Sequence, residues 1–410
     1  MSSLEITEIK KLVDKKIEHL SQRIREISHT IYENPELGLS EFKAVDLLTK
    51  ELESHGYSIE RNVASLSTAF KASKGNLGEP TVGFIAEYDA LPDIGHACGH
   101  NIISASAVGA AIGLADFLDN TGGRVVVFGT PNEEGATAEG GKLNDIESQV
   151  RGKVKMVESG SFKEIDAVME IHPYVKTTLT PDFLALIPVK ISFTGKPAHA
   201  AAAPEMGVNA LEAIILTFNS INSLRQHLRS DTRIHGIITE GGEAPNIVPE
   251  KTSALFYLRA SDKKYLDEVL LKVKKCAEGA SIATGAILDF HPSSYSLANM
   301  INNKTLCKFF ETNLIELGME IDELDRHEHL GSSDIGNVSY VVPAIQPLIS
   351  VGEKDIAIHS REFGKATISK KGDQSLILAT KALAFTFLDL MVDKEIFHKI
   401  KMEHKESFQC

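Results

Sequence analysis

A cysteine and a histidine stand two positions apart in the segment FIAEYDALPDIGHACGHN, which covers residues 84–101. Cys98 and His100 flank a single glycine, so a thiolate and an imidazole leave a flexible backbone close to each other. Thiolate and imidazole are both good ligands for transition metals. Such a pair suits one ion or two, and the segment therefore predicts the floor of a metal site.

Two adjacent glutamates, Glu133 and Glu134, follow directly after the apolar run VVVF in the segment GTPNEEG. Taken alone, such a pair is typical of a solvated loop. At the end of a strand beside a metal, one carboxylate can bind the ion while its neighbour polarises a water. The sequence by itself leaves both interpretations open.

Two further histidines lie far apart along the chain, His172 in VMEIH and His359 in IHSREF. Each alone is more typical of a surface or hydrogen-bonded core histidine than of a ligand. With Cys98, His100 and Glu134 they make a set of five ligands. That number suits two ions that share a bridging ligand and a bridging water, and a thiolate can bridge.

Four polar residues in the middle of the chain form a second group: His199 in GKPAHAAAAPEMG, His235 in RIHGIITEGG, Asn246 in APNIVPE and Arg259 in FYLRAS. Each of them also has an interpretation without function: His199 as an exposed loop residue, His235 as a core histidine, Asn246 as a turn residue and Arg259 as a solvated side chain. The functional interpretation is that they bind a substrate held by the metals.

The elements that must position these residues alternate between strand and helix. Apolar residues recur every three or four positions over 4–31, which predicts a long amphipathic helix. Apolar runs predict strands at 81–86, 124–130 and 165–171, and a helix is expected at 102–117. The chemical segments follow these strands, as sites do in doubly wound α/β folds. We expect them to share one rim of a sheet.

A module of different order begins near Leu186. Its expected elements follow a β-α-β-β-α-β order, with strands at 189–194, 234–239, 253–259 and 286–291 and helices at 208–228 and 264–282. A ferredoxin-like module of this kind has its ends near each other and can be inserted into a host domain. The first pattern then resumes, with helices expected at 303–317 and 373–390 and a strand at 344–351.

The length supports this division, because 410 residues exceed what one hydrophobic core usually holds. We expect a discontinuous α/β catalytic domain at 1–185 and 296–410, with the inserted module at 186–295.

Composition argues against several classes of partner. The formal net charge of −13 repels phosphate backbones, so nucleic acid is not expected. No segment approaches the ~20 uninterrupted apolar residues of a membrane span, and the charged first residues do not resemble a secretory signal. The four cysteines lack paired spacing, which favours a reducing compartment. We expect a cytoplasmic protein that binds a small molecule.

Nine motifs occur in an order that covers nearly the whole chain: FIAEYDALP, HACGHN, GTPNEEG, EIHP, GKPAHAAAAPEMGVNAL, RIHGIITEGG, APNIVPE, GSSDIGNVS and HSREF. In this order they resemble the aminoacylase/carboxypeptidase family of dinuclear metallopeptidases. The sequence is most similar to the amidohydrolase branch, which includes hippurate hydrolases, p-aminobenzoyl-glutamate hydrolases and certain dipeptidases. The resemblance implies a metallopeptidase-type catalytic domain with an inserted ferredoxin-like dimerisation domain, and hence a homodimer.

The resemblance also implies a ligand set. Two divalent ions, manganese or zinc, are expected to be bound by Cys98, His100, Glu134, His172 and His359.

Further roles follow from the same resemblance. Glu133 is expected to be the general base, and Asp89 to support the metal site. His199 is expected to reach the active site of the partner subunit and stabilise an oxyanion there. Asn246 and Arg259 match positions that hold the carboxylate or carbonyl of the substrate.

Two positions depart from the family pattern. Asn101 follows HACGH where much of the branch has aspartate, as in the members nearer to dipeptidases and aminobenzoyl-glutamate enzymes. Glu87 replaces the first metal histidine of the wider family, consistent with the use of Cys98 in this branch. A thiolate favours zinc, whereas this branch often works with manganese.

The expected activity is metal-dependent hydrolysis of the amide bond in N-acyl amino acids or dipeptide-like substrates. The alternative is a catalytically silent protein that binds amino-acid derivatives in the same cleft. Because Glu133 and all five candidate ligands are present, the sequence favours the enzyme.

Overall fold

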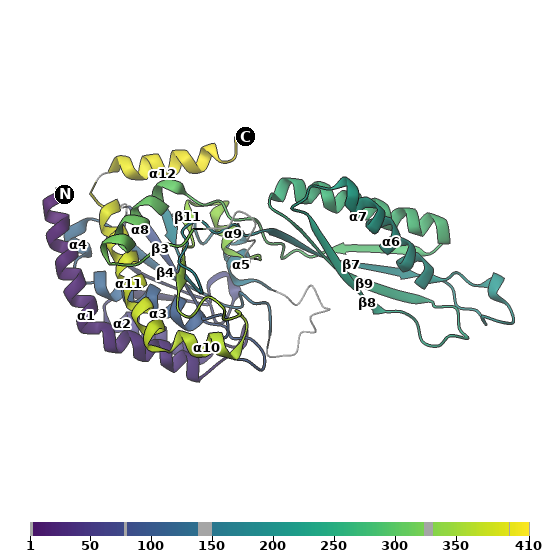
Figure 1. Cartoon of the computed structure of the whole chain (residues 1–410), viewed down its shortest axis with the longest axis horizontal. Helices are drawn as coiled ribbons and strands as arrows, with labels where there is room; N and C mark the ends of the chain where they lie inside the picture. The colour runs from purple at the N-terminus through teal and green to yellow at the C-terminus, as the bar shows by residue number, and fades with distance from the viewer. Residues whose placement is uncertain (1–2, 78–79, 138–149, 324–330, 393, 410) are drawn as a thin grey trace.

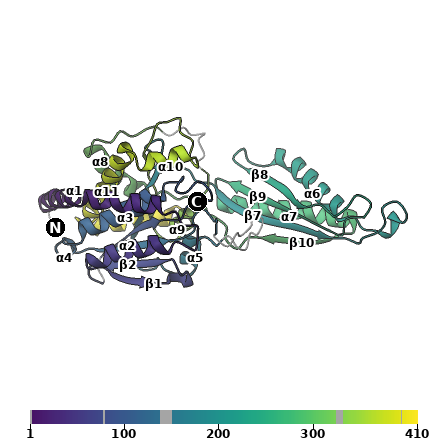
Figure 2. The ribbon, with the colours of Figure 1, turned by 90° about the horizontal axis from the view of Figure 1, so that it is seen from below.

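The computed structural model describes residues 3–77, 80–137, 150–323, 331–392 and 394–409. Figure 1 shows a larger domain that holds both ends of the chain, and an elongated module that extends away from it. The same division is visible from below in Figure 2. Within these residues, no single helix is both long and apolar enough to cross a membrane.

A six-stranded sheet in the order β1-β2-β4-β3-β5-β11 forms the centre of the larger domain. β3, β4, β5 and β11 run parallel, whereas β2 is antiparallel to its neighbours β1 and β4. The strands are β1 (Ser58–Arg61), β2 (Phe70–Lys74), β3 (Thr81–Glu87), β4 (Arg124–Thr130), β5 (Ala167–Met169) and β11 (Ala344–Ile345).

Helices cover both faces of this sheet, which confirms the predicted doubly wound α/β fold. Successive residues of β3 point to opposite faces of the sheet. Phe84 joins the hydrophobic core on one face, and Ile85 joins the core on the other. The first group is α1 (Ser3–Glu33), α2 (Phe42–Ser54), α3 (His100–Leu114), α8 (Lys304–Glu316) and α11 (Lys370–Leu390). The opposite face carries α5 (Gly152–Glu158) and α9 (Ile335–Ser339).

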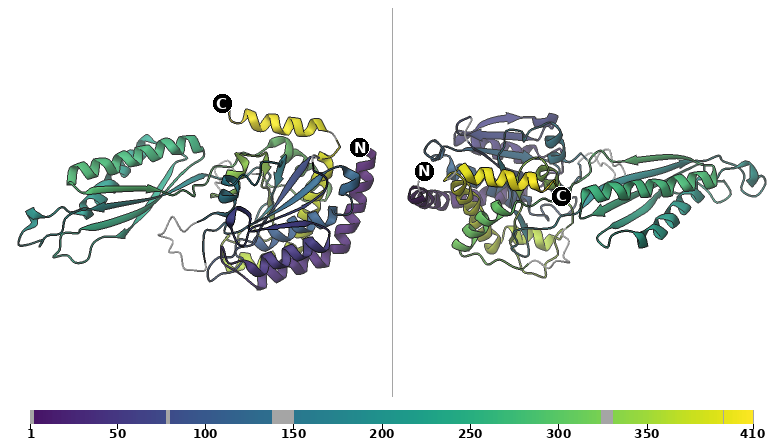
Figure 3. Two further views of the ribbon diagram at one scale, coloured as in Figure 1. Left: turned by 180° about the vertical axis from the view of Figure 1, so that it is seen from behind. Right: turned by 90° about the horizontal axis from the view of Figure 1, so that it is seen from above.

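Three further helices complete the larger domain: α4 (Leu118–Thr121), α10 (Arg361–Thr367) and α12 (Lys394–Glu406). The sequence pattern did not predict α12, which lies on the outside of the domain (Figure 3).

The predicted strand at 344–351 is in fact two strands that belong to different sheets. After β11 the chain continues as β12 (Leu348–Ser350), which pairs in parallel with β6 (His172–Tyr174) in a separate two-stranded sheet. Pro347 stands between β11 and β12 and has no N–H to continue the ladder, which explains the break. The same break separates β5 from β6, so the strand predicted at 165–171 ends at Met169 and His172 begins a strand of the second sheet.

The inserted module has a four-stranded antiparallel sheet in the order β10-β7-β9-β8, with helices α6 and α7 on one face (Figure 1). It has a hydrophobic core of its own, to which both helices contribute. The elements are β7 (Ala185–Thr194), α6 (Ala210–Leu224), β8 (Arg233–Glu240), β9 (Lys251–Ala260), α7 (Lys263–Thr284) and β10 (Ile287–Pro292). This is the expected ferredoxin-like β-α-β-β-α-β order.

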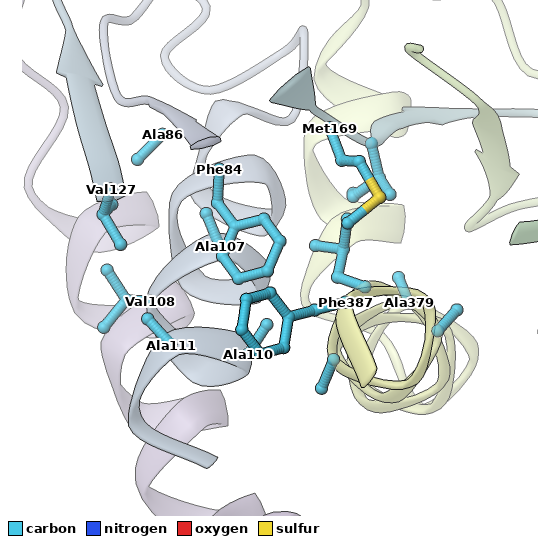
Figure 4. Packing of buried hydrophobic residues seen from close by; sticks show 14 of the residues in the cluster. Phe84, Ala86, Ala107, Val108, Ala110, Ala111, Val127, Met169, Ala379 and Phe387 are labelled. Atoms are coloured by element: carbon cyan, nitrogen blue, oxygen red, sulfur yellow. The ribbon is translucent and has the colours of Figure 1, made fainter. Parts of the chain in front are cut away.

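Aromatic side chains fill the space between the main sheet and its helices. In Figure 4, Phe84 on β3 and Phe387 on α11 both point into the core beside the small residues of α3. The two phenylalanines are fully buried. They belong to one hydrophobic cluster, which joins the strand that leads into the site to α11.

Replacement of Phe387 by alanine should lower the free energy of unfolding by about 3–5 kcal/mol, because it leaves a cavity beside α3. The matched control is Phe42→Ala, since Phe42 is 57% exposed and its loss should change stability little. Urea denaturation of both variants tests this. Equal losses in the two would contradict it.

Candidate metal centre and substrate cavity

The predicted chemical residues lie at the carboxyl ends of the parallel strands. Asp89 comes two residues after β3, Glu133 comes three residues after β4, and His172 begins β6 beyond the end of β5. In open α/β sheets this is where ligands bind.

The structure brings all five candidate ligands together. Their ligand atoms lie within 4.8 Å of one another in two overlapping groups, Cys98, His100 and His172, and Cys98, Glu134 and His359. Cys98 belongs to both groups, as a bridging ligand would. The Cys98 Sγ atom lies 3.5 Å from His172 Nε2, and His359 Nε2 lies 3.4 Å from Glu134 Oε1.

Hydrogen bonds behind the cluster orient its ligands. His100 Nδ1 lies 2.9 Å from Asp89 Oδ1, and His172 Nδ1 lies 2.8 Å from the carbonyl oxygen of Pro173. When each Nδ1 carries the proton, Nε2 is left to bind a metal. The second oxygen of Asp89 accepts a hydrogen bond from the backbone N–H of Glu134, 3.0 Å away. Asp89 therefore fixes two ligands, which is how it would support a metal site.

The backbone adopts left-handed conformations at several points of the site, among them Gly99 (φ 83°), Asn132 (φ 55°) and His359 (φ 58°). Gly99 is required for space as well, because a Cβ there would lie 2.4 Å from Pro173 Cγ. This close approach lets Cys98 and His172 meet. Non-glycine residues with positive φ, such as Asn132 and His359, are uncommon and concentrate at functional sites.

The chemistry of these residues fits divalent cations. Burial and the Glu134 carboxylate raise the pKa of the Cys98 thiol well above its ordinary value, so a thiolate here requires a nearby cation. Within the described part of the chain, His100 Nε2 and Glu87 Oε2 are buried 3.1 Å apart, and neither has a well-aligned hydrogen bond. Sulfur, nitrogen and oxygen donors together suit zinc and also accommodate manganese.

The two adjacent glutamates occupy different electrostatic environments. Burial, followed by the Glu87 and Asp334 carboxylates, raises the pKa of Glu133 to about 8. Burial acts in the same direction on Glu134, but its hydrogen bond to His359 and the charge of His100 outweigh it and lower the pKa to about 2. One carboxyl is thus suited to exchange a proton and the other to remain an ionised ligand.

A cavity of about 460 Å³ opens beside the cluster. Cys98, Glu133, Glu134, His172 and His359 all line it. Its opposite walls come from the inserted module and from residues 331–333.

Two guanidinium groups also line this cavity, those of Arg151 and Arg259. Arg259 Nη1 donates a hydrogen bond of 2.7 Å to Ser332 Oγ, which ties the module to the larger domain. The Arg151 backbone carbonyl accepts a hydrogen bond from the N–H of Lys155, whereas its guanidinium forms no hydrogen bond or ion pair with the residues that the structure describes. Both cations are available to an anionic group of a substrate.

The other predicted residues of the module lie outside the cavity. Arg259 is opposite Leu186 near the start of β7, whereas Lys251, at the far end of β9, is opposite Thr194. Eight residues of strand span about 25 Å. His199 and Asn246 lie beyond that far end, where both are exposed and the backbone N–H of Ala200 donates to the Asn246 carbonyl.

His235 lies on the edge strand β8 opposite Tyr257, and their rings are 5.8 Å apart. Tyr257 lines the cavity and His235 does not. Of the predicted substrate-binding residues, Arg259 is therefore the one in the cavity of the same subunit.

Sequence patterns did not reveal the buried charges behind the metal cluster. Lys153, Glu170 and Asp334 are all buried next to Glu87. The segment RGKVKMVE looks like the start of an ordinary helix with solvated lysines, so nothing local distinguishes Lys153. For Asp334 the signal is its place in GSSDIGNVS, a motif without a predicted role.

Comparison with known proteins gives related sequences along the whole chain. Residues 185–283 match a family model described as a peptidase dimerisation domain. A curated Xaa-Arg dipeptidase of Mus musculus is 34% identical, over 100% of this chain and 95% of its own length. A p-aminobenzoyl-glutamate hydrolase chain of Escherichia coli is 29% identical, over 97% of this chain and 95% of its own length.

A solved structure shares the fold. It is a dinuclear metal-binding peptidase of the M20 family from Bacillus subtilis, similar over 91% of this chain and 99% of its own, with a TM-score of 0.69 and 19% identity.

Replacement of Cys98 by serine should reduce the metal bound per subunit, because the residue common to both ligand groups is lost. The matched control is Cys307→Ser, which alters a buried thiol with no place in either group. Elemental analysis after loading with zinc or manganese measures the ratio. Equal metal content in both variants would show that Cys98 is not a ligand.

Proposed function

The chain belongs to the aminoacylase/carboxypeptidase (M20) family of dinuclear metallopeptidases, and from this premise we propose that it hydrolyses the amide bond of dipeptides or N-acyl amino acids with a free carboxylate. The observation that carries the proposal is the placement of Glu133. Its carboxylate lines the cavity, and an oxygen lies within 4.8 Å of ligand atoms of His100 and Glu134.

The ions that Cys98, His100, Glu134, His172 and His359 would hold supply Lewis acidity, which lowers the pKa of a water and polarises the scissile carbonyl. The proposed ion is zinc or manganese.

Proton transfer falls to Glu133. Its carboxylate takes a proton from the attacking water and then gives it to the leaving amine. Burial and the neighbouring carboxylates raise the pKa of Glu133, which favours its taking up the proton of the water. The presence of this group also argues against the silent binder.

Recognition of the substrate is proposed to centre on Arg259, whose guanidinium faces the cavity and is held by Ser332. A guanidinium can bind a carboxylate with two parallel hydrogen bonds. Because the scissile amide bond lies a fixed number of bonds from that carboxylate, holding the carboxylate also positions the amide bond. A free carboxylate next to the leaving amine is common to dipeptides and N-acyl amino acids.

A homodimer is proposed to complete the site. The family model describes residues 185–283 as a dimerisation domain. Within its sheet β8 is an edge strand, and Ile237 and Ile238 on it are 59% and 44% exposed. An unpaired apolar edge is suited to pair with the same strand of a second copy. The distant His199 and Asn246 would then serve the partner's cavity.

A reducing, cytoplasmic location remains a proposal. It is supported by the need for a free Cys98 and by the three described cysteines, all of which are free.

The direct test is product analysis with zinc- or manganese-loaded protein. The panel follows the names of the relatives: Xaa-Arg dipeptides, p-aminobenzoyl-glutamate and hippurate. Replacement of Glu133 by glutamine should lower kcat at least about a hundredfold because the general base is lost. Metal content should be unchanged.

Glu158→Gln is the matched control, since Glu158 is exposed and does not line the cavity. Near-normal turnover by the Glu133 variant would refute its role. Absence of hydrolysis by metal-loaded wild-type protein across the panel would favour the silent binder.

Mixing two inactive variants tests the dimer. If His199 serves the partner's site, a heterodimer of the Glu133→Gln and His199→Ala chains has one intact site, so co-expression should restore up to about a quarter of wild-type activity. No recovery in heterodimers verified by tagged purification would show that His199 does not act across the interface.

A further inference from the structure

Lys153 carries a fully buried positive charge directly behind the metal cluster. Its ammonium contacts one carboxylate oxygen each of Glu87 and Asp334 and lies 4.0 Å from Glu170 Oε1. All four side chains have 0% relative exposure. Lysine is almost never buried so completely unless its charge is paired.

The two carboxylates belong to separate parts of the site. Glu87 is the last residue of β3, and its Oε2 lies 3.1 Å from His100 Nε2. Asp334 directly precedes α9, and its Oδ2 accepts a hydrogen bond of 3.0 Å from the backbone N–H of Lys153. Lys153 therefore joins the strand behind a metal ligand to the segment that follows the cavity wall at 331–333.

The residues just before Lys153 pack against the loop that carries Glu133 and Glu134. Asn132 Nδ2 donates a hydrogen bond of 2.5 Å to the carbonyl oxygen of Val150. Gly152 approaches so closely that a Cβ there would lie 2.0 Å from the carbonyl oxygen of Pro131. A shift of Lys153 would thus be transmitted to the loop as well.

The position of the ammonium resembles that of a bound cation. Oxygen atoms of Glu87, Glu133 and Asp334 lie within 4.8 Å of one another, which is a spacing suited to an ion. Lys153 Nζ contacts two of these three carboxylates. The ammonium supplies there the positive charge that the carboxylates require, and it holds Glu87 and Asp334 in fixed orientations.

We propose that Lys153 is a positioning residue for the hydrolysis: its ammonium fixes Glu87 behind His100 and Asp334 behind the cavity wall, so that the metal-binding residues and the substrate wall keep one relative geometry. The activity part of this inference rests on the proposed function, whereas the part concerning metal binding does not.

The charge balance of the cluster supports the assignment. The ammonium is surrounded by three fully buried carboxyl groups, those of Glu87, Glu170 and Asp334. The Lys153 ammonium is the nearest counter-charge for Glu87 and lies closer to it than His100 does. Loss of the ammonium alone would leave buried anions uncompensated.

The experiment therefore uses a charge-balanced pair. Lys153→Met combined with Asp334→Asn removes one positive and one negative charge, so the net charge of the cluster is unchanged and Glu87 keeps its contact with His100. Thermal unfolding of the metal-free protein checks that the double variant folds. The control is Lys155→Met, which alters a partly exposed lysine of the same helix.

Two measurements follow on each protein. Zinc affinity, measured by competition with a coloured chelator, should fall about 10–100-fold in the double variant and stay unchanged in the control. In the cobalt-loaded protein, the visible absorption that reports on geometry around Cys98 and His100 should also change. With a substrate from the panel, kcat should fall by about the same factor as the metal affinity, even at saturating metal.

Wild-type zinc affinity, cobalt spectrum and kcat in a stable double variant would overturn the proposal and leave Lys153 with a role in stability alone. If wild-type protein hydrolyses no substrate, the proposed function fails, but affinity and spectrum still decide whether Lys153 positions the ligands.

Discussion

Buried carboxylates at the ends of β3 and β4 impose the constraint on which the site depends. Glu87, Asp89, Glu133 and Glu134 all lie within or beside one small cluster and are withdrawn from water. Anions so close together repel one another, and burial strengthens that repulsion. The fold meets the constraint with hydrogen bonds to Asp89 and with the Lys153 ammonium, and the metal ions of the family would supply the remaining positive charge.

The site also depends on the backbone conformation of the loops that carry its residues. Gly99 lets the chain turn in a left-handed conformation against Pro173, which brings the Cys98 thiol to His172. Asn132, just before the glutamate pair, is held from behind by Glu41, whose Oε1 accepts its backbone N–H at 2.9 Å. Thr68 donates to the other oxygen of Glu41. These contacts make the loop rigid, as expected where a base and a ligand are adjacent but must point differently.

The candidate substrate-binding residues of the inserted module lie at opposite ends of its sheet. Arg259 at the near end of its sheet takes part in the wall of the cavity, while His199 and Asn246 lie at the far end, about 25 Å along the strands. A rigid sheet cannot bring both ends to one cavity within a single chain. The proposed dimer resolves this, because a second module can present its far end to the first subunit's metals.

The sequence by itself determined the fold class and the set of candidate ligands, because hydrophobic periodicity and strand-end positions are local patterns. It placed Cys98 and His100 on one turn and predicted that strands at 81–86 and 124–130 would share a rim. It failed where distant segments decide the outcome. Pro347 breaks a predicted strand into two sheets, an effect that depends on the pairing partner of each half. Lys153 looked like a surface lysine because burial is a property of the assembled layers. Only the tertiary structure brought it to Glu87 and Asp334, 66 and 181 residues away along the chain. Electrostatic pairing over such separations leaves no periodic trace in the sequence, since it depends on distances in space alone.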